Sequence, residues 1–297
     1  MKHEARLYAM LMLMGLTWGT VFPITKIAVS TGYKPFGIVV WQMIIGVTLS
    51  AVIILLRGQK FPNLRKNWML FLGVAILGTL APNYFSYTAS AALPAGIMSI
   101  VIATVPLFAM GIALMMGFEK ASLKRLIGAG CGAAAIVLII GPEGGLPDPS
   151  KVGFVLLAIG APLLYGAEAN FLTWIGSRGL GAVQVMFGAM LFSLVLSIPL
   201  TYATGQFITP FQVWGKPEWA IVVVSVLNWL TYVWYVWLIG RSGPVFASQV
   251  AYLVTGWGVV ISMVFLAERY SLWVWLAFGL MLAGIALVRP KTREANA

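Results

Sequence analysis

The sequence predicts an all-α polytopic membrane protein with ten transmembrane helices arranged as two inverted five-helix repeats. Three observations predict this fold: the composition, the spacing of the charged residues, and a short motif that occurs twice. Of 297 residues, 61% are hydrophobic and only 9% are charged, and the mean hydropathy is +0.95. So few charges cannot coat a soluble globule. The apolar runs are continuous and about 20 residues long, which is the length of a membrane-spanning helix and not of a β-barrel strand.

Charged residues and turn signals divide the first half into five apolar intervals. The first interval, 7–25, is too long for the apolar core of a signal peptide and predicts the first span. Residues 35–56 predict the second span. Residues 67–118 carry no charge and predict two spans, 68–90 and 95–117, because residues 93–96 read Leu-Pro-Ala-Gly and favour a turn. Residues 126–142 predict the fifth span.

A segment rich in glycine and proline follows and is the clearest linker in the chain. Beyond it, five more apolar intervals predict spans at 152–175, 182–204, 219–239, 245–267 and 272–288. We therefore divide the chain into a first five-helix repeat at 1–142, an external linker at 143–151 and a second repeat at 152–297.

A repeated motif relates the two halves. Residues 119–123 read Glu-Lys-Ala-Ser-Leu, and residues 268–272, 149 positions later, read Glu-Arg-Tyr-Ser-Leu. Each copy ends one apolar run and begins another, so Ser122 and Ser271 are expected to be the N-caps of the fifth and tenth spans, with Glu119 and Glu268 in the turns before them. Because each half holds an odd number of spans, the second half enters the membrane upside down, as in secondary transporters.

The lysine and arginine residues indicate the orientation. With a cytoplasmic N-terminus, fourteen of the nineteen fall inside and five outside, so both termini are expected in the cytoplasm. This distribution accounts for the net charge of +11 without nucleic acid as a partner, because no soluble domain is predicted on which a basic groove could form. The five outer residues are Lys26, Lys34, Lys151, Lys216 and Arg269.

Motifs along the whole chain resemble the EamA family of the drug/metabolite transporter superfamily. They are Trp18-Gly19-x-x-Phe22-x-x-x-Lys26 in the first span, Pro106 in the fourth, and Glu119-x-x-Ser122 with its repeat. The resemblance implies a ten-helix inner-membrane carrier of small metabolites, similar to the branch that exports amino acids, including aromatic ones. In the ninth span Thr255 stands where the fourth span has Pro106, so the second half matches the pattern less closely.

Glu168 is the one acid inside a predicted span. An ionised carboxylate in hydrocarbon costs several kcal/mol unless it is solvated or paired, so we expect it to face a water-filled cavity or a partner. It is a candidate site for a substrate amine or a proton. The alternative is a structural carboxylate that bonds two helices together without a role in transport.

Polar and aromatic side chains on single helix faces are the other candidates for substrate binding. Asn83 and Tyr87 are four residues apart, and so are Asn228 and Tyr232. Amides can hold the charged groups of a zwitterion, and rings supply apolar and cation–π contacts. The alternative is hydrogen bonding between helices. Ser248, Gln249 and Tyr252 form a similar patch in the ninth span.

Trp18 and Tyr165 occupy equivalent positions of the two repeats, at an offset of 147, and are expected either to line and gate the cavity or to pack the repeat interface. Lys26 is expected to be an anchor at the outer end of the first span, with its charge extended toward the membrane surface.

The expected function is secondary transport of small zwitterions, amino acids first, by alternating access through a central cavity between the repeats. The expected partners are that substrate and membrane lipid, and the sequence is compatible with a monomer. A multidrug or cationic-drug exporter of the same superfamily is the close alternative. A membrane-embedded enzyme would need acid pairs, histidines or an Asp-rich motif, and we expect no enzyme, cofactor or metal site: the sequence has one histidine, His3, and one cysteine, Cys131.

Overall fold

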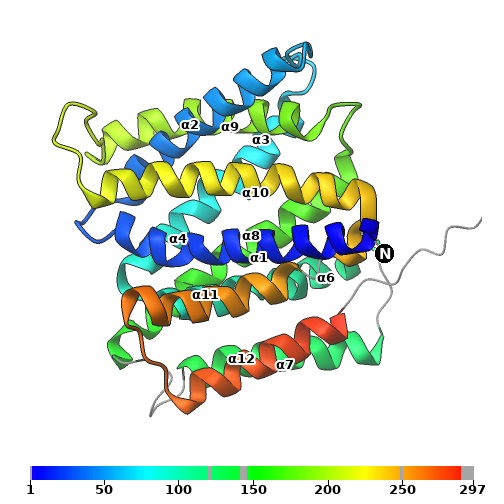
Figure 1. Ribbon diagram of the computed structural model, residues 1–297, viewed down its shortest axis with the longest axis vertical. Helices are drawn as coiled ribbons and strands as arrows, with labels where there is room; N and C mark the ends of the chain where they lie inside the picture. Colours follow the sequence, from blue (N-terminus) through cyan, green and yellow to red (C-terminus); the bar gives the residue numbers. More distant parts are fainter. Residues whose placement is uncertain (1, 119–121, 141–145, 147, 248–249, 289–297) are drawn as a thin grey trace, which may run out of the picture.

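In the described residues, ten helical units, five in each half of the chain, stack in layers to form one bundle (Figure 1). The structure, a computed structural model, describes residues 2–118, 122–140, 146, 148–247 and 250–288. The first half contains α1 (Lys2–Ala28), α2 (Pro35–Leu56), α3 (Trp68–Val74), the π-helical turn η1 (Ala75–Leu80), α4 (Ala81–Ala92), α5 (Ala95–Ile102), α6 (Val105–Met115) and α7 (Leu123–Ile140). The second contains η2 (Pro149–Lys151), α8 (Val152–Ile175), α9 (Ala182–Ala203), α10 (Lys216–Ala247), α11 (Val250–Leu266) and α12 (Leu272–Val288).

All ten predicted spans are confirmed as helical units. Within the described residues, six units are long and apolar enough to cross a membrane, and three shorter apolar helices lie at 126–140, 250–266 and 272–287. The third span is built from α3, η1 and α4, and the fourth from α5 and α6.

The two interrupted spans owe their breaks to proline. Proline has no backbone N–H to donate, and its ring crowds the carbonyl group four residues earlier. Pro82 follows η1, so the crowded carbonyl is that of Gly78, and the chain widens there into a π-helical turn. Pro106 stands at the start of α6, where α5 has ended and Thr104 begins a new helix. The third span therefore stays one continuous helix with a π-helical turn inside it, whereas the fourth is made of two shorter helices, α5 and α6.

The two halves pack against each other in equivalent ways. The first helix of the first half, α1, packs against α10 and α11 of the second, and the first helix of the second half, α8, packs against α4 and α6 of the first. The α1–α11 and α8–α6 contacts each bring a glycine close to the backbone of the other half. A Cβ atom at Gly19 would lie 2.9 Å from the Gly258 nitrogen, and one at Gly166 would lie 2.7 Å from the Ala109 nitrogen. These glycines are 147 positions apart and their partners 149, which are the offsets of the sequence repeat.

The loops define the two ends of the bundle. In Figure 1 the helices run across the view, with α2 and α9 at one edge of the stack and α7 and α12 at the other. The N-terminus lies at the right-hand end. The opposite end carries the last turn of α1, the turn between α4 and α5, the linker before α8 and the 267–271 loop. We call it the Lys26 end; in the orientation expected from the charges it faces outward.

Candidate functional site

Glu168 lies on α8 with its carboxylate pressed against the π-helical turn of the third span. It is half-buried. A Cβ atom at Gly78 would lie 2.2 Å from Oε1 and 2.7 Å from Oε2 of this carboxylate, so only a glycine leaves room for it. Among the described residues, no hydrogen bond to the Glu168 carboxylate is present. The acid therefore has open acceptor positions for a ligand or water.

Phenol groups of the second half lie near this carboxylate, and one of the first half lies next to them. Tyr165, one turn earlier on α8, and Tyr232 on α10 both lie within electrostatic range of Glu168. Tyr165 is in turn within range of Tyr87 on α4, and Tyr232 is within range of Tyr235 on its own helix. The tyrosines thus link the third, sixth and eighth spans around one acid.

Amide side chains of α2 and α4 continue this arrangement of polar groups next to Tyr87. Asn83 Nδ2 donates a hydrogen bond to Gln42 Oε1 over 3.1 Å, and the Tyr87 hydroxyl donates to the same oxygen over 2.7 Å. All three side chains are buried. Asn83 and Tyr87 share a helix face, as predicted, and each makes a bond between helices. Gln42 was missed in the sequence; the available signal was an amide inside the otherwise apolar second span.

Trp18 joins the set from α1. Its ring lies 5.8 Å from that of Tyr235, measured between centroids, at 52°. Asn228 is half-buried on α10, one turn before Tyr232. The eight residues that these hydrogen bonds, this ring contact and these electrostatic interactions connect are called the central group: Trp18, Gln42, Asn83, Tyr87, Tyr165, Glu168, Tyr232 and Tyr235.

The remaining predicted residues lie elsewhere. Ser248 and Gln249 fall outside the described residues. Tyr252 on α11 packs against a large apolar cluster that includes Ile97 and Val101. It is therefore part of the packing between α11 and the fourth span, and we do not include it in the central group.

The chemistry of the central group favours a ligand with a positive group. Its one ionisable acid, Glu168, stands among aromatic rings, and none of its eight members is a lysine or an arginine. An ammonium ion gains from both the carboxylate and the ring faces. The amides and hydroxyls supply neutral donors and acceptors for a second polar group. Within the described residues, no cluster of His, Cys, Asp and Glu could hold a metal ion.

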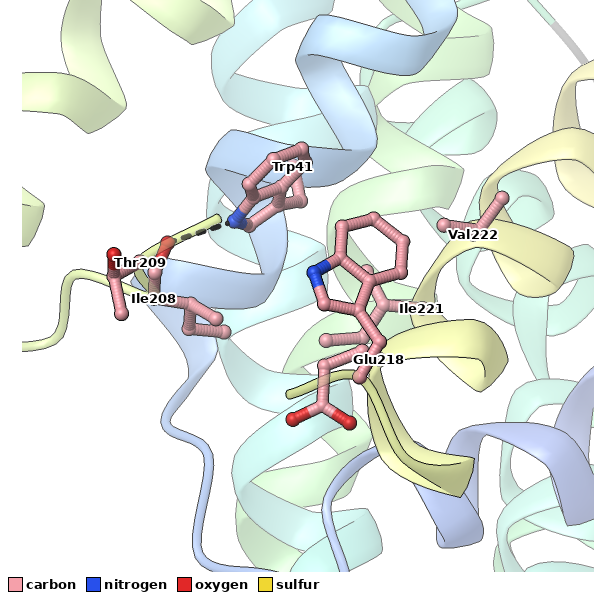
Figure 2. A pocket seen from close by; sticks show the side chains of 7 residues that line it. Trp41, Ile208, Thr209, Glu218, Ile221 and Val222 are labelled. Carbon is pink, nitrogen blue, oxygen red and sulfur yellow. Dashed lines mark hydrogen bonds between the residues drawn. The ribbon is translucent and has the colours of Figure 1, made fainter. Parts of the chain in front are cut away.

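A small pocket between the 205–215 loop, α2 and α10 is too small for a substrate. Figure 2 shows Trp41 and Glu218 around it, and the Trp41 indole N–H donates to the Ile208 carbonyl oxygen over 3.0 Å. Its volume of about 10 Å³ admits no more than a water molecule. Next to it the Tyr33 hydroxyl donates to Glu218 and accepts from Gln212, which fastens the loop.

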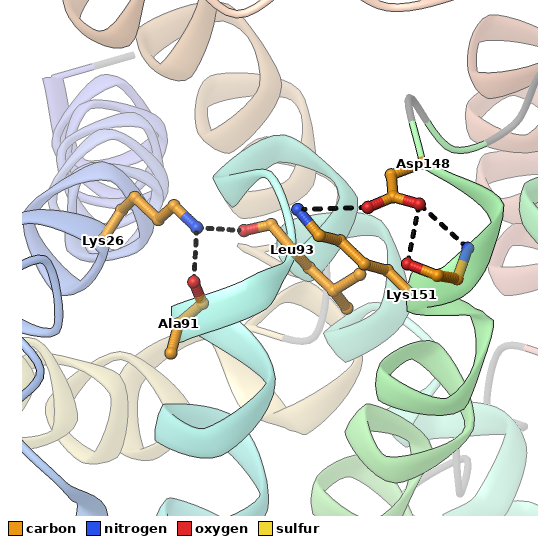
Figure 3. A network of polar contacts seen from close by, with 6 residues as sticks. Lys26, Ala91, Leu93, Asp148 and Lys151 are labelled. Carbon is orange, nitrogen blue, oxygen red and sulfur yellow. Dashed lines mark hydrogen bonds and ion pairs between the residues drawn. The ribbon is translucent and has the colours of Figure 1, made fainter.

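A larger cavity lies at the Lys26 end and has a volume of about 210 Å³. Four charged residues line it, two cations and two acids: Lys26, Asp148, Lys151 and Glu268. Lys26 does not extend toward the membrane surface as predicted. Its Nζ donates to the carbonyl oxygens of Ser90, Ala91 and Leu93, over 2.8, 3.2 and 2.8 Å, at the end of α4. Figure 3 shows the bonds to Ala91 and Leu93. The last carbonyls of a helix lack partners within the helix, and a cation bound to them also complements the helix dipole.

The second copy of the repeated motif also has a different role from the predicted one. Glu268 accepts hydrogen bonds from the N–H groups of Ala95 and Gly96, over 2.8 and 3.2 Å, and therefore caps α5 of the other half. Ser271 does precede α12, but its buried hydroxyl has no hydrogen-bond partner. Glu119, in the first copy, lies outside the described residues.

These features define a class: a polytopic carrier made of two repeats that hold a polar and aromatic site between them. The model of the EamA-like transporter family matches residues 6–141 and 153–289, so this chain belongs to that family. It is a transporter and not an enzyme.

Named relatives agree with this assignment. The chain is 25% identical over 291 residues to the uncharacterized inner membrane transporter YedA of Escherichia coli strain K12, across 95% of this chain and 90% of YedA. YedA of E. coli O157:H7 matches equally well. A solved crystal structure shares the fold, with a TM-score of 0.64 and 19% identity over 94% of this chain and 97% of the other.

Proposed function

We propose that this protein is a secondary transporter that exports small metabolites, most of all amino acids, across the inner membrane by alternating access. The central group is the proposed substrate site, and both termini face the cytoplasm. The inner-membrane relatives support the location. The excess of Lys and Arg on the terminal side supports the orientation.

One observation carries the proposal: side chains from both halves form one connected group, which contains a single acid, where the repeats meet. Trp18 comes from the first helix of the first half and Tyr165 from the first helix of the second, and Tyr232 of the second half lies within electrostatic range of Glu168. In carriers of this architecture a site between the repeats becomes exposed to alternate sides as one half rocks against the other. Gly19 and Gly166 bring the two halves into backbone contact at equivalent points, which supports such a motion.

In the proposed mode of binding, the substrate ammonium meets Glu168 and the aromatic faces, and the substrate carboxylate meets neutral donors. A carboxylate among amides and hydroxyls is held by hydrogen bonds, each contributing about 1.5–3 kcal/mol when one partner is charged. Phosphorylated substrates fit poorly, because the central group offers no lysine or arginine to neutralise them.

A second candidate function is export of cationic drugs. The aromatic rings beside Glu168 favour it, because a cationic drug without a carboxylate needs no donor to bind one. The two functions differ in which residues they require. Amino-acid transport needs both Glu168 and the amide side of the group, whereas cation transport needs Glu168 and the rings alone.

Counterflow in proteoliposomes tests both. Purified protein is loaded with one unlabelled compound and challenged with a labelled one, across a panel of amino acids and cationic drugs. The proposal expects amino acids to exchange, and Asn83→Ala to weaken their exchange more than that of any cation. Exchange of cations without amino acids supports the second candidate and refutes the first.

A further inference from the structure

The 210 Å³ cavity at the Lys26 end shares no residue with the central group. It lies where three segments, which come from both halves, meet. Pro94 comes from the turn between α4 and α5, Leu146 and Asp148 come from the linker, and Glu268 comes from the 267–271 loop. Pockets for drug-sized molecules have volumes of about 300–1,000 Å³. This cavity suits a smaller molecule.

Two of its four charged residues, Lys26 and Glu268, bind the backbone of the α4–α5 turn. A lysine ammonium has three donors, and the three carbonyls at the end of α4 take all those of Lys26. Glu268 accepts the first N–H groups of α5 and also the Tyr270 hydroxyl. A cation on a helix C-terminus and an acid on an N-terminus complement both helix dipoles. These bonds fix the α4–α5 turn as the floor of the cavity.

The other two charged residues are free to act on a ligand. Lys151 and Asp148 form one ion pair of 3.9 Å, and their side chains are 40% and 47% exposed. An exposed pair of this length contributes little to stability and is easily opened. Figure 3 draws this pair, and both of its members line the cavity together with Lys26. The Ser150 hydroxyl and N–H hold the pKa of Asp148 below its usual range, so this carboxylate keeps its charge.

The balance of charges indicates the class of ligand. Two cations and two acids line one small cavity. A ligand with a net negative charge meets the acids at close range, and one with a net positive charge meets the lysines, so each is repelled by half of the lining. A small zwitterion has a partner for each of its ends.

We propose that this cavity is a second binding site, an outer vestibule in which a small amino acid docks with its carboxylate on Lys151 and its ammonium on Asp148. The vestibule deepens the proposed function and rests on it, because it lies at the end of the bundle toward which substrate is exported. There it receives substrate that leaves the central group, or substrate that re-enters from outside.

The transport test uses labelled L-alanine and membrane vesicles of both orientations. Lys151→Ala should raise the half-saturation concentration about 3- to 10-fold for uptake from the Lys26 end, the loss of a single charged contact, and change it less than about 2-fold from the other end. Lys151→Arg should keep most of the wild-type value. The matched control is Lys34→Ala, which removes an exposed lysine from the same end. No change in Lys151→Ala, an equal change in Lys34→Ala, or an equal change from both ends would overturn the proposal.

A binding measurement separates the vestibule from the proposed function. Saturation-transfer NMR on the purified protein, with L-alanine, acetate and ethylammonium as probes, needs no transport. The vestibule expects a contact to L-alanine that weakens in Lys151→Ala and not in Lys34→Ala, and that neither acetate nor ethylammonium displaces at equal concentration. This result supports the vestibule even where counterflow of amino acids fails, and counterflow alone decides the proposed function. L-alanine contacts that are equal in the wild type and Lys151→Ala would overturn the vestibule.

Discussion

Replacing Gly78 by alanine should displace the Glu168 carboxylate while leaving the fold intact. The added Cβ atom would lie 2.2 Å from Oε1, and ordinary contacts begin at 3.4 Å, so the carboxylate must retreat by about 1.2 Å. The atoms that must move are the far end of a flexible side chain, which makes the adjustment inexpensive. Alanine also favours helix over glycine by roughly 1 kcal/mol. Thermal stability should therefore be unchanged or slightly higher.

Transport by Gly78→Ala should fall much more than stability. A charged hydrogen bond contributes about 1.5–3 kcal/mol, so a misplaced carboxylate should lower the ratio of maximal rate to half-saturation concentration roughly 10- to 100-fold. The assay is the initial rate of counterflow in proteoliposomes with matched protein content. Gly111→Ala is the control, because a Cβ atom at Gly111 meets nothing within 4 Å.

A compensating change makes this test sharper. Glu168→Asp shortens the side chain by one methylene and withdraws the carboxylate from Gly78 in η1. Adding Gly78→Ala to Glu168→Asp should then cause little further loss, so the two substitutions should be strongly non-additive. A wild-type rate in Gly78→Ala, or a full additive loss in the double variant, would refute the role assigned to Gly78 and to the position of the acid.

Three further predictions concern the interface, the amide side and the vestibule. Gly19→Ala and Gly166→Ala each force a side chain into the backbone of the other half and should lower stability by about 1–3 kcal/mol. The control Gly279→Ala, whose added Cβ atom meets nothing within 4 Å, should not. Melting curves in detergent check this, and equal melting temperatures would contradict it. Tyr87→Phe removes one buried hydrogen bond and should lower stability by about 1 kcal/mol, measured in the same way, with no loss expected if that bond is not made. The pKa of Asp148 is lowered, so its carboxylate keeps its charge until the pH falls through that value. The half-saturation concentration for L-alanine taken up from the Lys26 end, divided for Asp148→Asn by that of the wild type, should therefore stay constant between pH 7 and pH 5. A ratio that falls toward one in this range would count against the vestibule.

The spans and the repeat were predictable from the sequence because membrane helices must be long, apolar and bounded by charges. The uncharged stretch 67–118 correctly predicted two spans joined at Pro94. The offset that aligned Trp18-Gly19 with Tyr165-Gly166 also placed two glycines that contact the opposite half at matching points. These features depend on local pattern, which one sequence contains in full.

The arrangement of the site was only partly predictable, because it depends on which helices meet. Glu168 was identified from the cost of a charge in hydrocarbon. Its proximity to Gly78 follows from a π-helical turn that no pattern announced, although Pro82 was the cause. The backbone groups that Lys26 and Glu268 bind lie 64 or more residues away in the chain, on helix ends whose positions only the packed fold defines.

The measurement that tests the central claim most directly is the pH–rate profile of amino-acid counterflow in the wild type and in Glu168→Gln. A carboxylate changes its charge with pH and an amide of the same shape does not. The account predicts that the wild type exchanges amino acids and that Glu168→Gln alters the rate or flattens its pH dependence, with melting behaviour unchanged. Identical profiles for the two proteins would remove Glu168 from the mechanism and contradict the proposed site.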